Sequence, residues 1–172
     1  EDADIVGEVV DGWKVGLILL GHERVGIARW VFRLQGQFEE LVEMTKRLEQ
    51  GGQPLIKDPF VRQRLIDYYA RTKAALYTYY RHLTKQLKTG HPGPEGSMDK
   101  LLSGALIQEL LGYAVSLQGA YSSLWREDAL VNTIWQNSYL RAFGHTIEGG
   151  TSEIQKNIVA ERILGLPKDV KF

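Results

Sequence analysis

Two glycines followed by two hydroxyl-bearing residues, near the end of the chain, form the pattern with the clearest chemical potential. Gly149-Gly150-Thr151-Ser152 precedes a stretch in which apolar residues recur at helical spacing, so it predicts a tight turn that opens onto a helix N-terminus. The unpaired N–H groups at such a helix end attract anionic groups such as phosphate. The alternative is a plain loop in which Thr151 or Ser152 only caps the helix.

Glu23 is the second candidate, because of its neighbours on a predicted helix. Leu19, Leu20, Gly26 and Ile27 stand three or four residues away on either side, which places the carboxylate on an apolar surface. A carboxylate held away from water has a raised pKa and can act as a base near neutral pH. The alternative is a structural glutamate at the edge of the apolar stripe, paired with a basic residue of another helix.

Helices joined by short loops must position both groups. Apolar residues recur at helical spacing over most of the chain, and Gly- and Pro-rich segments at 50–54 and 91–96 interrupt the pattern. Asp58 before Pro59 predicts the start of the second helix, and Ser97 is expected to cap the third. The pattern indicates an all-α fold, an up-and-down antiparallel bundle of four to five helices. The expected helices cover residues 13–48, as one long helix or two collinear ones, then 58–88, 97–125 and 129–142, and a last helix begins at residue 151. A strand-like or extended lead-in is expected over residues 1–12.

The composition narrows the classes of function. Lys and Arg number 21, as do Asp and Glu, within 172 residues, so no global field would recruit nucleic acid. The chain has no cysteine, which excludes disulfides, thiolate metal sites and cysteine nucleophiles, and no metal site is predicted. An uninterrupted run of about 18 apolar residues is absent, so no transmembrane segment is expected.

Read whole, the string from Gly149 to Pro167 resembles the C-terminal signature of acyl-CoA dehydrogenases. These flavoenzymes introduce a double bond between the α and β carbons of an acyl-CoA thioester. The resemblance implies FAD as cofactor, an acyl-CoA substrate, an electron-transfer flavoprotein as acceptor and a homo- or hetero-tetramer, in the cytoplasm or, in a eukaryote, the mitochondrial matrix. It also implies that residues 13–172 form the C-terminal helical domain of a larger flavoenzyme, with residues 1–12 leading in from a preceding β domain. The domain by itself is not expected to be active.

The resemblance assigns roles to individual residues. In most of the family the catalytic base directly precedes the Gly-Thr of the signature, but Gly149 stands there and Glu148 lies one residue earlier. In a second group, which resembles the isovaleryl and long-chain enzymes, the base precedes an arginine on the first long helix, and Glu23-Arg24 matches it. The resemblance therefore implies Glu23 as the base and the N–H of Gly149 as a donor to the thioester oxygen. It places three residues at FAD, namely Thr151, Ser152 and Glu153, and three at the acyl-CoA, namely His22, Arg24 and Gly150.

Two segments depart from the family pattern. An Arg-x-x-Phe-Gly segment and a later Gln-x-x-Gly-Gly segment usually reach the FAD of a neighbouring subunit, but here the chain has different residues at 48–55 and 120–127. This departure indicates a heteromeric enzyme, like the paired dehydrogenases of actinobacterial steroid side-chain breakdown. The alternatives are a non-catalytic assembly subunit, in which Glu23 is structural, and an acyl-CoA oxidase.

Overall fold

The computed structural model describes residues 4–131 and 133–168, and within the first helix it describes only the backbone of residues 21, 22, 24, 25, 27 and 28. Five α-helices dominate the described chain. They are α1 (Gly12–Arg47), α2 (Pro59–Thr89), α3 (Gly96–Ser116), α4 (Ile134–Ala142) and α5 (Ser152–Arg162). Short elements connect them: strands β1 (Glu49–Gln50) and β2 (Gln53–Pro54), and 3-10 turns η2 (Leu55–Lys57), η3 (Gly119–Ser123), η4 (Arg126–Asp128) and η5 (Phe143–Thr146).

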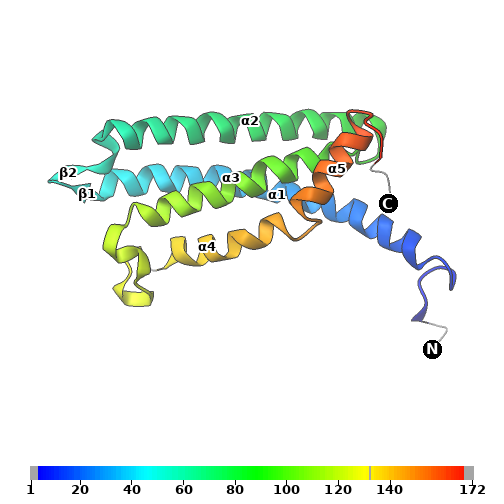
Figure 1. The fold of residues 1–172 in the computed structure, drawn as a ribbon, viewed down its shortest axis with the longest axis horizontal. Coiled ribbons are helices and arrows are strands. Elements are labelled where there is room, and N and C mark those ends of the chain that lie inside the picture. The colour runs from blue at the N-terminus through cyan, green and yellow to red at the C-terminus, as the bar shows by residue number, and fades with distance from the viewer. Residues whose placement is uncertain (1–3, 132, 169–172) are drawn as a thin grey trace.

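The first four helices run alternately up and down, and α5 crosses the end of the bundle where α2 gives way to α3 (Figure 1). The all-α antiparallel bundle predicted from the sequence is therefore confirmed. No described helix is long and apolar enough to cross a membrane.

Helix α3 is the centre of the bundle. It packs against α1, α2, α4 and α5, and Ile107, Leu110 and Ala114 on it are fully buried. On α1, Val31, Leu34 and Leu41 are also fully buried, at the three- and seven-residue spacings that align side chains along one helix face. Because α3 is covered on several sides, its buried face is wider than a single stripe.

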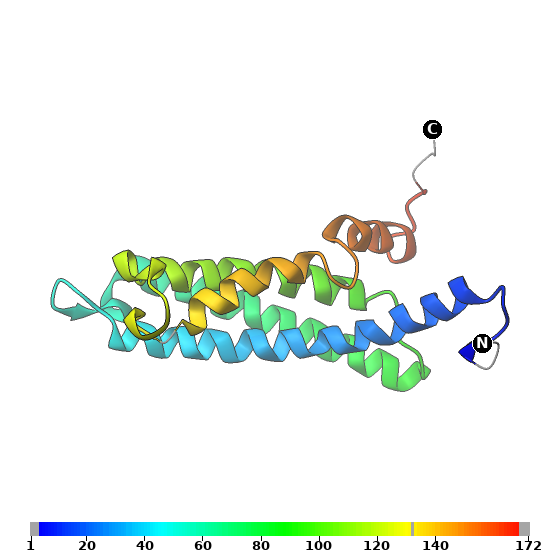
Figure 2. The same cartoon turned by 90° about the horizontal axis from the view of Figure 1, so that it is seen from below.

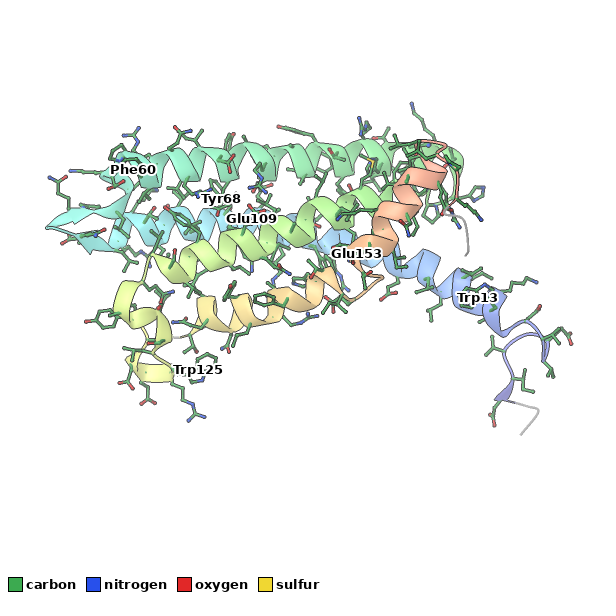
Figure 3. All side chains as sticks on the ribbon, viewed as in Figure 1. Trp13, Phe60, Tyr68, Glu109, Trp125 and Glu153 are labelled. Carbon is green, nitrogen blue, oxygen red and sulfur yellow. The ribbon has the colours of Figure 1, made fainter. Side chains whose placement is uncertain are left out.

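The N-terminal third of α1 extends beyond the other helices (Figure 2). Its apolar side chains are largely exposed, among them Trp13 at 74% and Leu19 at 68%, and Figure 3 shows Trp13 far from the bundle core. Exposed apolar groups that cluster in this way mark a surface to which another part of a protein binds.

Several boundaries differ from the sequence-based expectation. Helix α3 ends at Ser116 instead of residue 125, because Gly119 adopts a positive φ of 57° and the chain continues as η3 and η4. Helix α4 starts at Ile134 rather than 129. Residues 5–11 form turns and irregular backbone instead of a strand. The prediction that Ser97 caps α3 is wrong, since its hydroxyl is buried within the first turn of that helix and has no hydrogen-bond partner among the described residues.

A hairpin joins the first two helices where a simple stop was expected. Glu49 pairs with Pro54 and Gln50 with Gln53, and the two residues between them, Gly51 and Gly52, have φ values of 60° and 76°. Two consecutive positive φ angles define the tight turn whose twist matches paired strands, and glycine adopts them without steric cost.

Asp58 caps α2 as the sequence predicts, since its Oδ1 accepts hydrogen bonds from the N–H groups of Phe60 (2.7 Å) and Val61 (3.1 Å). Replacing Asp58 by Ala is expected to lower the free energy of unfolding by about 1 kcal/mol, because these donors lose their acceptor. Urea unfolding of the chain measures the change. Asp58→Asn keeps a capping oxygen and should lose much less; equal losses in the two variants would contradict the capping role.

Candidate functional site

The glycine turn lies between η5 and α5. Gly149 and Gly150 have φ values of 67° and 92°, in the left-handed region that residues with a Cβ rarely adopt. Thr151 is the N-cap of α5, where its hydroxyl oxygen accepts from the N–H of Ile154 at 3.4 Å. The turn predicted from the sequence is thus present, and of the two candidate caps, Thr151 and Ser152, Thr151 caps the helix.

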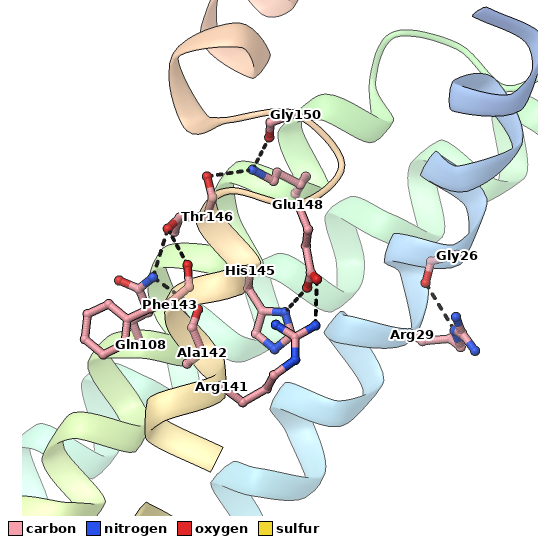
Figure 4. A network of polar contacts seen from close by, with 11 residues as sticks. Gly26, Arg29, Gln108, Arg141, Ala142, Phe143, His145, Thr146, Glu148 and Gly150 are labelled. Carbon is pink, nitrogen blue, oxygen red and sulfur yellow. Dashed lines mark hydrogen bonds and ion pairs between the residues drawn. The ribbon is translucent and has the colours of Figure 1, made fainter. Parts of the chain in front are cut away.

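Two buried side chains hold the carbonyl groups of this turn from inside the bundle. Gln155 Nε2 donates to the Gly149 carbonyl at 2.6 Å, and Lys100 Nζ donates to the carbonyls of Gly150 (2.5 Å) and Thr146 (3.2 Å). Figure 4 shows the hydrogen bonds to the Thr146 and Gly150 oxygens. In a trans peptide the N–H points opposite to the carbonyl of the same unit. The N–H groups of Gly150 and Thr151 therefore face away from Lys100 and Gln155.

The amide groups of the turn are available as donors. Among the backbone hydrogen bonds between described residues, none uses the N–H of Gly149, Gly150, Thr151 or Ser152. Unpaired N–H groups at the start of a helix suit an anionic group or an oxygen that gains negative charge. The residues present therefore fit the flavin cofactor and the thioester that the sequence resemblance implies.

Each carboxylate oxygen of Glu148 contacts one partner. Oε2 accepts from Arg141 Nη2 at 2.6 Å, and Oε1 faces His145 Nδ1 at 2.8 Å (Figure 4). Partial burial raises the pKa of Glu148, but the hydrogen bonds from Arg141 and His145 outweigh it and hold that pKa below its ordinary value. A carboxylate stabilised in its ionised form is a weak proton acceptor, so Glu148 is poorly suited to act as a base.

His145 connects this loop to α1. Its ring, only 4% exposed, lies against the Trp30 ring with centroids 4.4 Å apart. Burial lowers the pKa of His145, and although Glu148 opposes the shift, Arg141 and Arg33 act in the same direction as burial. A neutral imidazole that donates Nδ1–H to Glu148 accounts for the contact between them.

Glu23 lies seven residues before Trp30 on α1. Seven residues are close to two helical turns, so the two side chains share a face and stand about 10 Å apart along the axis. Since Trp30 contacts His145 in the loop, Glu23 lies on the stripe of α1 that continues from this contact. Its side chain is exposed, as are Leu19 and Leu20 beside it. The side chain of Ile27, the other large apolar neighbour expected there, lies outside the described residues.

The other predicted site residues fall into two groups. Thr151 and Glu153 are exposed and Ser152 is half-buried at the start of α5, and Figure 3 shows Glu153 on the outside of that helix. The pKa of Glu153 is lowered by its own backbone N–H and then by the Thr151 hydroxyl. The backbones of His22 and Arg24 are in α1, but their side chains lie outside the described residues.

Lys100 and Gln155, called the tethers here because they hold the carbonyls of the glycine turn, were not among the residues predicted from the sequence. Lys100 is 1% exposed and Gln155 is 2% exposed. One signal for Lys100 was available: it stands four and seven residues before Gly104 and Ile107, which are buried on α3. A lysine at core spacing in a helix indicates a buried cation that needs acceptors.

A second region contains the two segments that depart from the family pattern. The β1–β2 hairpin and η3 lie at the end of the bundle opposite the glycine turn (Figure 1). They line one groove, with Glu49 and Gln50 on one side and Gly119 and Tyr121 on the other. The two departures therefore alter a single surface.

The stability of this site should depend on pH. The folded chain resists protonation of His145, whose pKa is lowered, whereas the unfolded chain takes up that proton below about pH 6.5. The free energy of unfolding is therefore expected to fall as the pH drops from 7 towards 5.5, by up to about 1.4 kcal/mol per pH unit from this group. Glu148, whose pKa is also lowered, adds a further loss below about pH 4.5. Urea unfolding at a series of pH values measures both losses.

His145→Asn removes the titrating ring and should flatten the upper part of this dependence. Contributions that the two proteins share cancel, so the difference in slope between them isolates His145. Identical slopes above pH 5.5 would contradict the role of this ring.

Comparisons with known proteins give matches over nearly the whole chain. Residues 10–164 match the family model of the acyl-CoA dehydrogenase C-terminal domain. The chain is 33% identical over 168 residues to acyl-CoA dehydrogenase IpdE1 of Mycolicibacterium smegmatis, covering 97% of this chain and 40% of that protein. IpdE1 of Mycobacterium tuberculosis is 31% identical over 172 residues, covering 99% of this chain and 42% of that protein. The chain thus spans about two fifths of the length of these relatives.

Solved structures share the fold. The steroid ACAD Tcur3481-Tcur3483 superposes with a TM-score of 0.83 at 23% identity, covering 97% of this chain and 43% of that one. The ChsE4-ChsE5 complex from Mycobacterium tuberculosis has a TM-score of 0.79 at 25% identity, covering 95% of this chain and 43% of that one.

Proposed function

This chain belongs to the acyl-CoA dehydrogenase family and corresponds to the C-terminal helical domain of such enzymes, and we propose that it is part of an FAD-dependent enzyme. The proposed reaction dehydrogenates an acyl-CoA thioester between its α and β carbons. The observation that carries this proposal is the glycine turn. Its carbonyls are held inside the bundle and its N–H groups are available outside. A thioester oxygen that gains negative charge when the α proton leaves needs donors that are fixed in advance.

Glu23 is the proposed base that takes the α proton. Its position on the stripe of α1 that leads to Trp30, which contacts His145 shortly before the glycine turn, supports this role. Its carboxylate also has no ion-pair partner among the described residues. Glu148 is the competing carboxylate, but Arg141 and His145 already occupy its oxygens. Covering the exposed apolar segment around Glu23 by the rest of the enzyme would remove water and raise the proton affinity of the carboxylate.

The remaining proposed roles are those that the family resemblance implies. The N–H of Gly149 is the proposed donor to the thioester oxygen, and Gly150, His22 and Arg24 are proposed to contact the acyl-CoA. Thr151, Ser152 and Glu153 would hold FAD, with the hydroxyl and N–H groups facing its anionic parts. FAD, when bound, supplies the acceptor for the hydride that leaves the β carbon.

The substrate class and assembly are also proposals. The likeness to a steroid ACAD and to the ChsE4-ChsE5 complex, together with the single altered surface at 48–55 and 120–127, supports a heteromeric enzyme that acts on a steroid-type acyl-CoA. A partner subunit with the usual segments would complete the flavin site. We propose an electron-transfer flavoprotein as acceptor, a tetrameric assembly and a cytoplasmic location.

The altered surface also favours a second candidate, a non-catalytic subunit that only supports assembly. The visible spectrum of the complete protein, purified alone and with a co-expressed homologous subunit, separates the two. Anaerobic bleaching of a flavin band by one acyl-CoA thioester is the expected result, and bleaching by a steroid-type thioester supports the substrate class. A protein without flavin in both preparations would overturn the enzymatic proposal. Oxygen consumption without added acceptor would instead identify an oxidase.

A further inference from the structure

Lys100 is a buried cation without a carboxylate partner. Its side chain is 1% exposed, and among the described residues no carboxylate lies within ion-pair distance of Nζ. Burial lowers the pKa of Lys100, although Glu153 and Glu148 oppose this shift from a distance. A buried, unpaired ammonium is costly compared with an apolar side chain of the same size. Core packing therefore does not explain why this position carries a lysine.

The acceptors of Lys100 indicate what the charge does. Both are backbone carbonyls of the segment that contains the glycine turn, Thr146 before the turn and Gly150 within it. A cationic donor on a carbonyl forms a stronger hydrogen bond than a neutral donor. It also polarises the amide, so that the N–H of the same peptide unit, here that of Thr151, becomes a better donor.

Gln155 acts on the neighbouring peptide unit. It donates to the Gly149 carbonyl at 2.6 Å, which directs the Gly150 N–H outward. The turn is thus held at consecutive carbonyls, by α3 through Lys100 and by α5 through Gln155. Neither side chain can reach the outer face of the turn, because both are buried behind it.

We propose that Lys100 is a positioning residue of the catalytic site. From behind the turn it holds the carbonyls of Thr146 and Gly150, which lie on either side of Gly149. It thereby fixes the segment that presents the Gly149 N–H to the thioester oxygen and the N–H groups of Gly150 and Thr151 to the substrate and the flavin. Gln155 assists from α5. This inference rests on the proposed function and adds to it the device that holds the donors in place before reaction.

The test uses the complete enzyme, with its partner if required, and an acyl-CoA analogue whose α proton is acidic enough to be lost on binding. The fraction of bound analogue present as enolate, read from its absorption, reports how well the turn stabilises negative charge on the thioester oxygen. It is measured together with kcat and KM, each per bound flavin. Lys100→Met, an apolar side chain of similar length, is expected to lower kcat and the enolate-to-thioester ratio by about 10- to 100-fold. KM should change less than threefold, and Lys100→Gln, which keeps a neutral donor, should lie in between.

Gln136→Leu is the matched control. Gln136 is also buried and donates to Gln118 Oε1 (3.2 Å) and to the Leu124 carbonyl (3.4 Å), away from the glycine turn. The Gln136→Leu variant should have a lower free energy of unfolding than the wild type but the same enolate fraction. The inference is wrong if the kcat and the enolate-to-thioester ratio of Lys100→Met, per bound flavin, equal those of the wild type. It is also wrong if they fall no further than those of Gln136→Leu.

Two further outcomes are decided in the same experiment. If the Lys100 variants do not bind flavin, Gln155→Met replaces them in the same measurement. An unchanged enolate fraction in Gln155→Met then overturns the inference. A wild-type enzyme that neither dehydrogenates an acyl-CoA nor binds the analogue as enolate refutes the proposed function itself, whereas an active wild type with unaffected variants refutes only the role of the tethers.

Discussion

Glu23→Gln in the complete enzyme is expected to lower the rate of dehydrogenation by about 10³-fold or more while flavin stays bound. Glutamine has nearly the same shape as glutamate but cannot accept the α proton, and loss of a positioned base commonly costs two to four orders of magnitude. Rapid-reaction measurement of flavin reduction by the thioester isolates this step.

Two matched substitutions accompany this prediction. Glu148→Gln tests the competing carboxylate, and since its oxygens are already engaged by Arg141 and His145, the rate should fall far less than in Glu23→Gln. Glu39→Gln changes an exposed glutamate of the same helix and should leave the rate unaltered. A severe loss in Glu148→Gln with little change in Glu23→Gln would assign the base to the loop. Little change in both would favour the non-catalytic subunit.

Gly150→Ala is the second change with a large expected effect. Gly150 has a φ of 92°, and a Cβ there would lie 2.7 Å from Gln155 Nε2. The substitution therefore adds backbone strain and also displaces the side chain that holds the Gly149 carbonyl. We expect a loss of about 2 kcal/mol in the free energy of unfolding, and about a 10²-fold loss in rate per bound flavin, since donors of the turn would move.

Gly90→Ala provides the control for backbone strain alone. Gly90 caps the end of α2 with a φ of 78°, and a Cβ at this position would meet no atom within 4 Å. It should cost about 1 kcal/mol in stability and leave the rate per flavin unchanged. Equal effects of the two alanines on stability and on rate would show that contact with Gln155 has no part in the site.

The family and most of the helical arrangement could be predicted from the sequence because their signals are local. Asp58 before Pro59 and Thr151 after two glycines determine helix starts through hydrogen bonds within three residues. Helical spacing of apolar residues identifies the faces that must pack together. The string after Gly149 identified the family, since it lies within one turn and one helix.

The end of α3 and the inner side of the turn were decided by the tertiary structure. Residues 117–125 carry apolar groups at spacing compatible with helix, yet Gly119 adopts a left-handed conformation and the buried Gln118 contacts Gln136 of α4. That contact depends on how α3 and α4 pack, which local spacing does not specify.

For the site, the sequence by itself determined the glycine turn, a hydroxyl cap at Thr151 or Ser152, and the place of Glu23 on α1. Only the tertiary structure placed Lys100 behind Gly150, which follows it by 50 positions in the sequence. It placed the Trp30 ring against the ring of His145. It also showed that Glu148 is held by Arg141 and His145. The physical reason is that a buried polar group must find its partner wherever the packed chain provides one, and the partner's position follows from the packing of whole helices.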